Sequence, residues 1–251
     1  MGRIRTAIGM AKTLLTYYGK PFRLRGERSF YGGVLGIGAG DLVFDIGAHV
    51  GNRVRAFRSL GARVIAVEPQ SAPRAVLEKL YGASPEVRII GAACGAAAGR
   101  QTMRVSETSP TLSTLSGKWI DTVGRSEGFR GVTWDREETV AITTLDALIA
   151  EHGMPDFVKI DVEGFEAEVL AGLSRPLPLL SFEFLPASIT VAVSCVQRLE
   201  ALGAYEYTYA IGETMKPAEE NWVGPHEMTA RLEAMPPPGP SGDVYARRVR
   251  R

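Results

Sequence analysis

The sequence predicts an α/β fold built around a doubly wound, mostly parallel sheet. Three observations support this fold class. Short apolar runs of strand length recur along the 251-residue chain, as expected for parallel strands that are buried on both faces. Segments with apolar residues at helical spacing lie between these runs. Glycines or helix-capping residues mark many of the boundaries between the two kinds of segment.

The first unit of this fold lies between residues 41 and 69. Its parts, in chain order, are a strand (42–46), a glycine turn (47–51), a helix (50–60), a second strand (63–67) and a terminal acid (Glu68). Arg53, Arg55 and Arg58 are expected on the face of the helix opposite its apolar residues. Strand, turn, helix, strand and acid together form the plan of a nucleoside-binding, Rossmann-like unit.

The turn indicates which nucleoside compound would bind. A dinucleotide site has three glycines that let backbone amides reach a pyrophosphate, whereas this turn has His49 at the second glycine position. Asp45, at the end of the first strand, would repel a pyrophosphate and suits a ligand with a cationic amino acid part. Glu68 is placed to accept hydrogen bonds from a ribose diol. S-adenosylmethionine meets both demands and NAD meets only the second; a plain turn without a ligand is the alternative.

The rest of the chain supplies the other elements of the sheet. Three further core strands are expected at 87–90, 157–160 and 179–184, and a closing antiparallel hairpin pairs 205–211 with 243–249. Another strand, outside this core set, is expected at 139–143. Helices are expected at 71–81 (capped by Ser71), from 145 (capped by Thr144), at 165–173 and at 188–202. The prediction is therefore a seven-stranded sheet with an antiparallel C-terminal hairpin. The small residues 91–95 would let an adenine edge approach the backbone.

We expect residues 1–251 to form one domain, because the sequence has no internal repeat and no convincing boundary. Residues 1–29 are a helical or extended lead-in to it. The segment 96–131 is dense in Ser, Thr and Gly and lacks a regular pattern. Long loops inside compact domains are usually functional or mobile. We interpret this one as a lid or acceptor-side loop, with a plain surface loop as the alternative.

Acidic residues are expected to gather at one edge of the sheet, since ligands of open parallel sheets bind outside the carboxyl ends of the strands. Four core strands end at or near an acid: Asp45, Glu68, Asp161 and Glu183. Uncompensated carboxylates repel one another and resist burial, so a sulfonium cation or a divalent metal would offset their charge. Lys159 projects to the same side as Asp161 and is expected to pair with one of the acids. Asp161 and Glu163 have a second interpretation as caps of the following helix.

Composition limits the possible partners. The formal net charge is +1, which gives no broad basic face for nucleic acid. Two distant cysteines, Cys94 and Cys195, lack metal or redox spacing and predict buried thiols in a reducing, cytoplasmic compartment. No apolar run is long enough to span a bilayer, so stable membrane insertion is not expected.

Three motifs resemble one known family. They are VFDIGAHVGN near residue 45, TLDAL at 144–148 and KIDVEGFEAEVLAGL at 159–173. Their order and spacing, over residues 30–184, are similar to those of the FkbM-type methyltransferases. The resemblance implies a class I methyltransferase fold, S-adenosylmethionine as methyl donor, and O-methylation of a small molecule or sugar. It implies that the donor is held by the two turns after the first two strands and by the small residues near 93: Asp45, Gly47, Ala48, His49, Gly51, Asn52, Glu68, Pro69 and Ala93.

Methyl transfer to a hydroxyl needs a base that takes its proton. Asp161 is the first candidate, as a general base or as a ligand of a divalent metal such as magnesium, with Glu163 and Glu183 in support. Two other function classes stay open: an inactive methyltransferase-fold binding subunit, and an NAD-dependent oxidoreductase or epimerase. The second would need a catalytic Tyr/Lys pair and the three-glycine turn, which is absent. The acceptor and the oligomeric state are not predicted.

Overall fold

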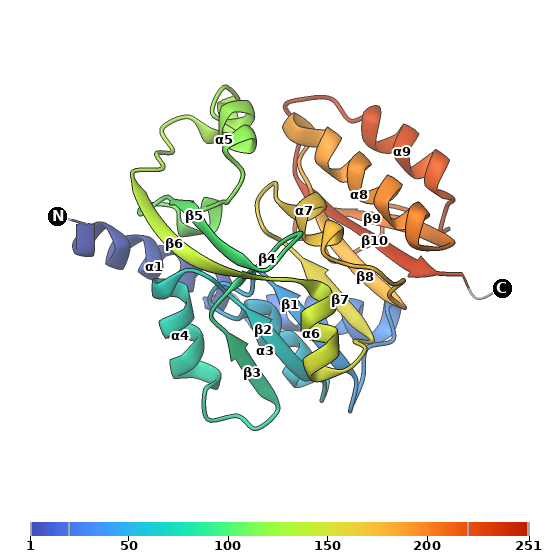
Figure 1. Cartoon of the computed structure of the whole chain (residues 1–251), viewed down its shortest axis with the longest axis horizontal. Helices are drawn as coiled ribbons and strands as arrows, with labels where there is room; N and C mark the ends of the chain where they lie inside the picture. Colours follow the sequence, from blue (N-terminus) through green and yellow to red (C-terminus); the bar gives the residue numbers. More distant parts are fainter. Residues whose placement is uncertain (1, 20, 220, 250–251) are drawn as a thin grey trace.

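The computed structural model describes residues 2–19, 21–219 and 221–249. Its centre is a seven-stranded sheet with the order β3-β2-β1-β7-β8-β10-β9 (Figure 1). The strands are β1 (Leu42–Ile46), β2 (Arg63–Val67), β3 (Val87–Ile90), β7 (Phe157–Ile160), β8 (Leu179–Phe184), β9 (Tyr205–Ile211) and β10 (Gly242–Arg248). Strands β3, β2, β1, β7 and β8 run parallel, and β10 pairs antiparallel with both β8 and β9. The predicted fold class, with its C-terminal hairpin, is confirmed.

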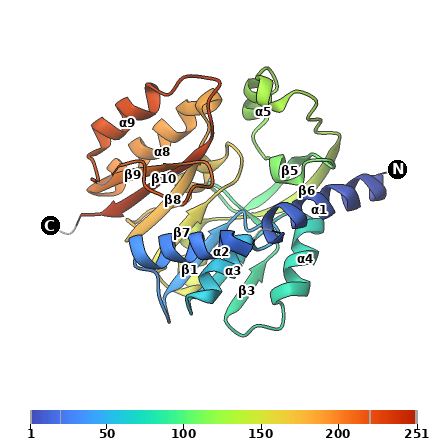
Figure 2. The ribbon, with the colours of Figure 1, turned by 180° about the vertical axis from the view of Figure 1, so that it is seen from behind.

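One face of the sheet is covered by the first half of the chain (Figure 2). The elements on it are a π-helix, η1 (Ser29–Val34), and the helices α3 (Asn52–Ser59) and α4 (Ser71–Tyr81). Val43 of β1 packs there with Tyr31 and Phe57, and all three are fully buried. Outside them lie α1 (Gly2–Tyr18) and α2 (Pro21–Arg28).

The other face is covered by helices from the second half of the chain. They are α6 (Leu145–His152), α7 (Glu166–Ala171), α8 (Ile189–Leu202) and α9 (Pro225–Glu233). Phe44, Val158 and Val196 belong to the core on this side and are fully buried. Because both faces are covered, the central strands are mostly apolar, which is the pattern that made them predictable.

The segment 96–131 is more regular than the sequence suggested. It contains β5 (Gly99–Val105), two short 3₁₀ turns, η2 (Pro110–Leu112) and η3 (Glu127–Phe129), and the helix α5 (Gly117–Val123). Strand β5 pairs antiparallel with β6 (Arg136–Thr143), which also pairs with β4 (Ala93–Cys94) in a second, three-stranded sheet. The expectation of an irregular segment is therefore wrong. Only Met103 and Val105 of β5 are buried, so this strand has too few apolar residues to show its period.

The predicted helix caps have different outcomes. The Thr144 side chain accepts a hydrogen bond from the Ala147 amide at 3.0 Å, as predicted for a cap of α6. Ser71 is not a cap: it is the first residue of α4, after Gln70, and its hydroxyl lies 3.3 Å from Oε2 of Glu138. Helix α8 is preceded by a 3₁₀ turn, η4 (Pro186–Ser188).

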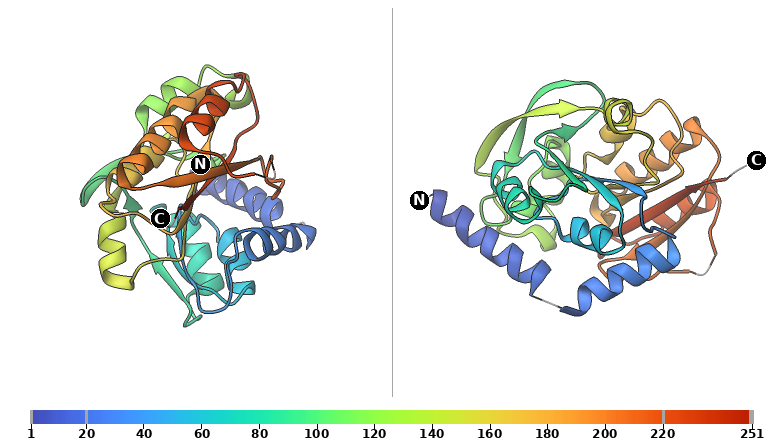
Figure 3. Two further views of the ribbon diagram at one scale, coloured as in Figure 1. Left: turned by 90° about the vertical axis from the view of Figure 1, so that its right-hand side faces the viewer. Right: turned by 90° about the horizontal axis from the view of Figure 1, so that it is seen from below.

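The chain ends lie on opposite sides of the molecule, and α1 and α2 follow one another along its outside (Figure 3). Within the described ranges, no helix combines the length and the apolar character needed to cross a membrane.

Candidate active site

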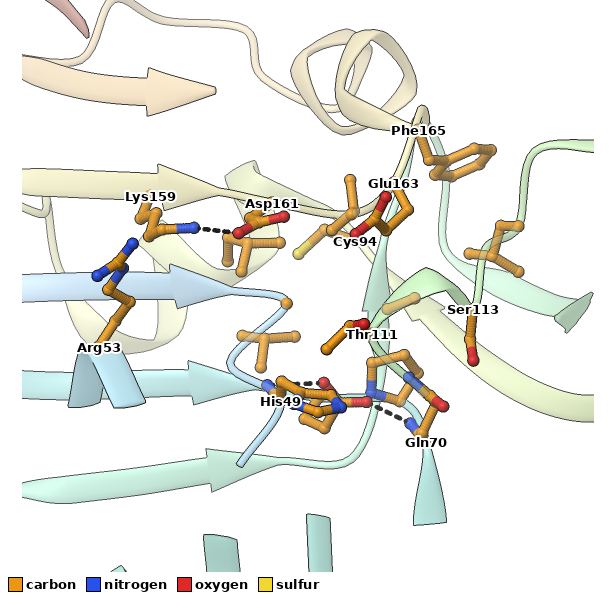
Figure 4. Close-up of a pocket in the computed structure, with 18 of the residues that line it drawn as sticks. His49, Arg53, Gln70, Cys94, Thr111, Ser113, Lys159, Asp161, Glu163 and Phe165 are labelled. Atoms are coloured by element: carbon orange, nitrogen blue, oxygen red, sulfur yellow. Dashed lines mark hydrogen bonds and ion pairs between the residues drawn. The ribbon is translucent and has the colours of Figure 1, made fainter. Parts of the chain in front are cut away.

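A pocket of about 820 Å³ lies at the carboxyl ends of β1, β2 and β7 (Figure 4). Gly47 and His49 line it after β1, Glu68 after β2, and Asp161 after β7. These segments meet because β1 pairs in parallel with both β2 and β7, which aligns their ends. The pocket therefore stands where the sequence predicted a ligand, at the carboxyl edge of the sheet.

The turn after β1 needs its two glycines for space as well as for conformation. Gly47 has φ +85°, and a Cβ on it would lie 1.9 Å from the carbonyl oxygen of Asp161. Gly51 has φ +83°, and a Cβ there would lie 2.6 Å from Leu77 and 2.7 Å from Tyr81. The turn is thus pressed against both β7 and α4, which fixes the pocket floor.

Glu68 is a buried carboxylate at the β2 end of the pocket. Its Oε2 accepts the His49 amide at 2.9 Å and its Oε1 accepts the Gln70 amide at 2.7 Å. Burial raises the pKa of Glu68 to about 7, against the opposing effect of these two hydrogen bonds. Each carboxylate oxygen has a second lone pair, so Glu68 keeps capacity to accept hydrogen bonds from a ligand.

Asp45 lies behind the pocket wall. It is 1% exposed, and its Oδ2 has no hydrogen-bond partner among the described residues. Burial raises its pKa to about 6, and the positive charges of Lys159 and Arg53 limit the rise. Lys159 is its register partner in β7. Asp45 thus joins the buried charges that support the pocket, without lining it.

His49 contributes an uncharged imidazole to the pocket. Burial lowers its pKa to about 4, so the ring is neutral at physiological pH. Neither ring nitrogen has a hydrogen-bond partner in the part of the chain that the structure describes, and the Tyr17 ring of α1 lies 6.4 Å away. Its φ of +48° falls in the left-handed region, as glycine's would at that position.

Lys159 and Asp161 form an ion pair between the sheet and the pocket. The Lys159 Nζ atom lies 2.5 Å from Oδ2 of Asp161, which confirms that this lysine pairs with one of the predicted acids. The lysine side chain is 2% exposed and the aspartate side chain 37% exposed. Burial acts to lower the pKa of Lys159, but the carboxylates of Asp161 and Asp243 together outweigh it and keep the ammonium charged.

Three carboxyl groups gather at the end of β7. The ligand atoms of Asp161, Glu163 and Glu183 all lie within 4.8 Å of one another. Burial raises the pKa of Glu163 and of Glu183 well above the ordinary value, and the neighbouring carboxylates add to the effect. Oxygen donors in such a group are those that magnesium and calcium prefer. The sequence proposed these three residues as a catalytic group, and the fold brings them together.

The turn that carries Glu163 is held by contacts with Thr114 and with Trp119 of α5. Glu163 has φ +54°, and its carbonyl accepts a hydrogen bond from the Thr114 hydroxyl at 2.7 Å. A Cβ on the following Gly164 would lie 2.1 Å from Trp119 of α5. Neither Asp161 nor Glu163 caps α7. Instead Glu166 accepts the Val162 and Gly164 amides at 3.1 and 3.2 Å, so the capping interpretation is wrong.

Arg53, which the sequence predicts on the helix face opposite the apolar residues, is buried. It is 5% exposed, lines the pocket, and donates to Glu27 of α2 at 2.7 Å and to Glu213 in the segment after β9. Burial raises the pKa of Glu27. Burial alone would also raise that of Glu213, but Arg53 and Arg23 lower it to about 2. The partners of Arg53 are distant in sequence, so helical periodicity alone could not identify them.

The segment 99–115 forms the outer wall of the pocket. Met103, Thr111, Ser113 and Leu115 line it opposite the strand ends. Gln70 connects the two sides, because its side-chain amide donates to the Pro110 carbonyl at 3.2 Å.

The predicted site residues fall into two groups. Those that line the pocket are Gly47, His49, Asn52, Glu68, Pro69, Ala93, Asp161 and Glu163. Asp45, Ala48 and Gly51 lie behind it, and Glu183 lines a smaller pocket of about 210 Å³ beside Trp119 and Glu166. Sequence reasoning missed Tyr17, Arg53, Gln70 and Glu213, whose neighbours come from distant segments.

The strand order and the position of the pocket define a class I methyltransferase fold. A TehB-like SAM-dependent methyltransferase from Corynebacterium glutamicum is similar in structure, with TM-score 0.50 and 10% identity over 99% of this chain and 100% of that chain. A precorrin-6y C5,15-methyltransferase from Geobacter metallireducens has TM-score 0.44 and 14% identity over 88% of this chain and 87% of that one. At these identities the similarity concerns the fold alone.

The family follows from the sequence. The FkbM methyltransferase domain model matches residues 45–184, which is more than half of the chain. The protein therefore belongs to the FkbM methyltransferase family, and the resemblance seen in the motifs is confirmed. A comparison with curated protein sequences gives no match.

Proposed function

We propose that the protein transfers the methyl group of S-adenosylmethionine to a hydroxyl group of a small molecule or sugar. The observation that carries the proposal is one pocket with Glu68 after β2 and with Asp161 and Glu163 after β7.

The residues after β1 and β2 would hold the donor. Glu68 would accept hydrogen bonds from the ribose hydroxyls through its remaining lone pairs. Ala93 and Cys94 have small side chains that leave room for the adenine ring. The negative charge of Asp161 favours the cationic sulfonium end. When bound, S-adenosylmethionine supplies an activated methyl group whose departure leaves a neutral thioether, so the protein needs no acid to expel it.

The protein's own task is to orient the acceptor and to remove its proton. Holding two reactants in line can supply much of the acceleration. We assign the proton to Asp161, because Lys159 keeps this carboxylate close to the pocket and balances its charge. Glu163 and Glu183 lie close enough to Asp161 to support it in handling that proton.

A divalent cation such as magnesium would be held by the same three carboxyl groups, where it would acidify the acceptor hydroxyl. EDTA treatment separates the two forms of the proposal. Loss of turnover that magnesium restores would support a metal site. Turnover that is unchanged in EDTA would leave Asp161 as the base.

We also propose that residues 1–251 act as one domain and that the segment 96–131 serves the acceptor side. Tyr17 from the N-terminal region and Thr111 from this segment line the same pocket. Without either segment, the pocket would lose part of its lining. We propose that its partner is a small molecule and not a nucleic acid. We also propose that the protein acts in the cytoplasm.

Calorimetric titration with S-adenosylhomocysteine, with NAD as the parallel control, tests the donor. We expect micromolar binding of the first and none of the second. Binding of NAD alone would favour an oxidoreductase. Binding of neither would favour an inactive scaffold. Release of S-adenosylhomocysteine in a screen of sugars and small hydroxylated compounds then tests the acceptor class.

A further inference from the structure

Helix α1 has an apolar outer face that the fold does not use. Ile8 and Leu15, seven residues apart and so on one side of the helix, are 64% and 74% exposed. Ala7 and Ala11 on the same side are exposed as well. In ordinary surface helices the exposed face is polar.

The opposite face of α1 is already packed against the molecule. Met10 and Thr13 are buried there, and a Cβ on Gly9 would lie 2.5 Å from the Glu107 carbonyl oxygen. The Tyr18 hydroxyl donates to the Val50 carbonyl at 2.9 Å. The orientation of the helix is therefore fixed, and its apolar outer residues cannot turn inward.

Helix α2 extends this surface. Phe22, at its start, is 82% exposed and is the most exposed large apolar residue among those described. The two helices follow one another along the same outer side of the molecule (Figure 3). Ile8, Leu15 and Phe22 are the exposed large apolar residues described on these two helices, and we call them together the N-terminal face.

The N-terminal face lies in a strongly basic part of the chain. Residues 2–28 contain seven Lys or Arg and one Glu, so they carry a net charge of +6 while the rest of the chain carries −5. Lys12, Arg25 and Arg28 are exposed. A second copy of this chain would bring a like charge against the face, which disfavours a symmetric dimer there.

We propose that the N-terminal face docks on the surface of an anionic lipid bilayer. Interfacial helices combine exposed apolar side chains, which enter the headgroup boundary, with basic residues that are attracted to anionic lipids. Both features are present here on helices too short and too polar to cross the bilayer. The bilayer would then lie beside α1, which also supplies Tyr17 to the pocket.

Co-sedimentation of the full chain with vesicles tests this inference. Vesicles of phosphatidylcholine with about 30% phosphatidylglycerol are compared with pure phosphatidylcholine, at low salt and at 0.5 M NaCl. We expect the partition coefficient to be at least tenfold higher on the anionic vesicles. High salt should remove most of that difference, because it screens charges beyond a few ångströms.

The decisive variant carries Ile8→Ser, Leu15→Ser and Phe22→Ser. Its matched control carries Leu80→Ser, Met154→Ser and Val249→Ser, which alter exposed apolar residues elsewhere. The first should lose at least tenfold in partitioning and the control less than twofold. A second variant, Lys12→Glu with Arg25→Glu and Arg28→Glu, leaves the apolar residues unchanged. It should lose binding to anionic vesicles. Circular dichroism melting verifies that each variant is folded.

Three results would overturn the proposal. The first is equal partitioning of the wild type on neutral and anionic vesicles. The second is equal loss in the serine variant and its control. The third is absence of vesicle binding together with a dimer in sedimentation velocity that the serine variant makes monomeric, which would assign the N-terminal face to a second copy.

Discussion

The ammonium group of Lys159 lies 2.5 Å from Oδ2 of Asp161, and the same lysine is the register partner of Asp45 in the neighbouring strand. One buried cation therefore offsets two carboxylates, of which one lines the pocket and the other lies behind it. Its charge explains how acids can stand at the ends of adjacent strands, where uncompensated carboxylates would repel one another.

Lys159→Met should destabilise the protein by about 3–5 kcal/mol at pH 8, because it leaves buried carboxylates without their cation. At pH 5 the loss should be smaller, since the carboxyls can then take up protons instead. Urea unfolding at the two pH values measures both effects. The exposed Lys79→Met is the control and should change stability by less than about 0.5 kcal/mol. An equal loss at both pH values would contradict the explanation.

Asp161→Asn should lower kcat by about 100-fold or more, which is the usual contribution of a general base. The affinity for S-adenosylhomocysteine should stay within about threefold, because the donor is held mainly after β1 and β2. The rate of S-adenosylhomocysteine release with the acceptor found in the screen measures kcat. Calorimetry measures the affinity for S-adenosylhomocysteine. Asp121→Asn, at an exposed aspartate of α5, should leave both unchanged. Wild-type turnover in the Asp161 variant would remove this residue from the chemistry.

Glu68 should make the ligand-free protein less stable as the pH rises. Its pKa is about 7 in the fold, against an ordinary value of 4.5. The folded state therefore binds the Glu68 proton more tightly than the unfolded state does. This group's stabilising contribution to the free energy of unfolding is complete below pH 4.5 and is lost as the pH rises to about 7. The shift corresponds to roughly 3 kcal/mol. Glu68→Gln should flatten the pH dependence of unfolding between pH 5 and 8, and an unchanged slope would contradict the assignment.

Much of the fold was predictable because its centre obeys local rules. Strands such as 42–46 and 157–160 are short apolar runs because helices cover both faces of the sheet. The C-terminal hairpin, at one edge of the sheet, was predictable from the same kind of local pattern. Strand β5 and helix α9 were not predicted, because the first is mostly exposed and the second follows a segment with weak periodicity.

The candidate site was predictable in part, for a related reason. The residues at strand ends, Glu68 and Asp161, could be placed from topology alone. Arg53 could not, because its burial depends on Glu27 in α2 and Glu213 after β9. Glu183 lies with Glu163 and Asp161, but it lines the neighbouring smaller pocket. Sequence spacing locates the sheet edge, and tertiary contacts decide which side chains reach the ligand.

Gly47→Ala should abolish measurable binding of S-adenosylhomocysteine and destabilise the protein more than a positive φ alone would. A left-handed conformation costs a non-glycine residue about 1–2 kcal/mol. At Gly47 the new Cβ would also lie 1.9 Å from the Asp161 carbonyl oxygen, so the turn must move away from β7. Gly36→Ala is the matched control, since Gly36 has φ +76° with nothing within 4 Å of its Cβ position. Urea unfolding and calorimetry of the two variants separate conformational strain from the clash. Equal destabilisation, with binding retained in both, would show that the contact between the turn and β7 does not shape the pocket.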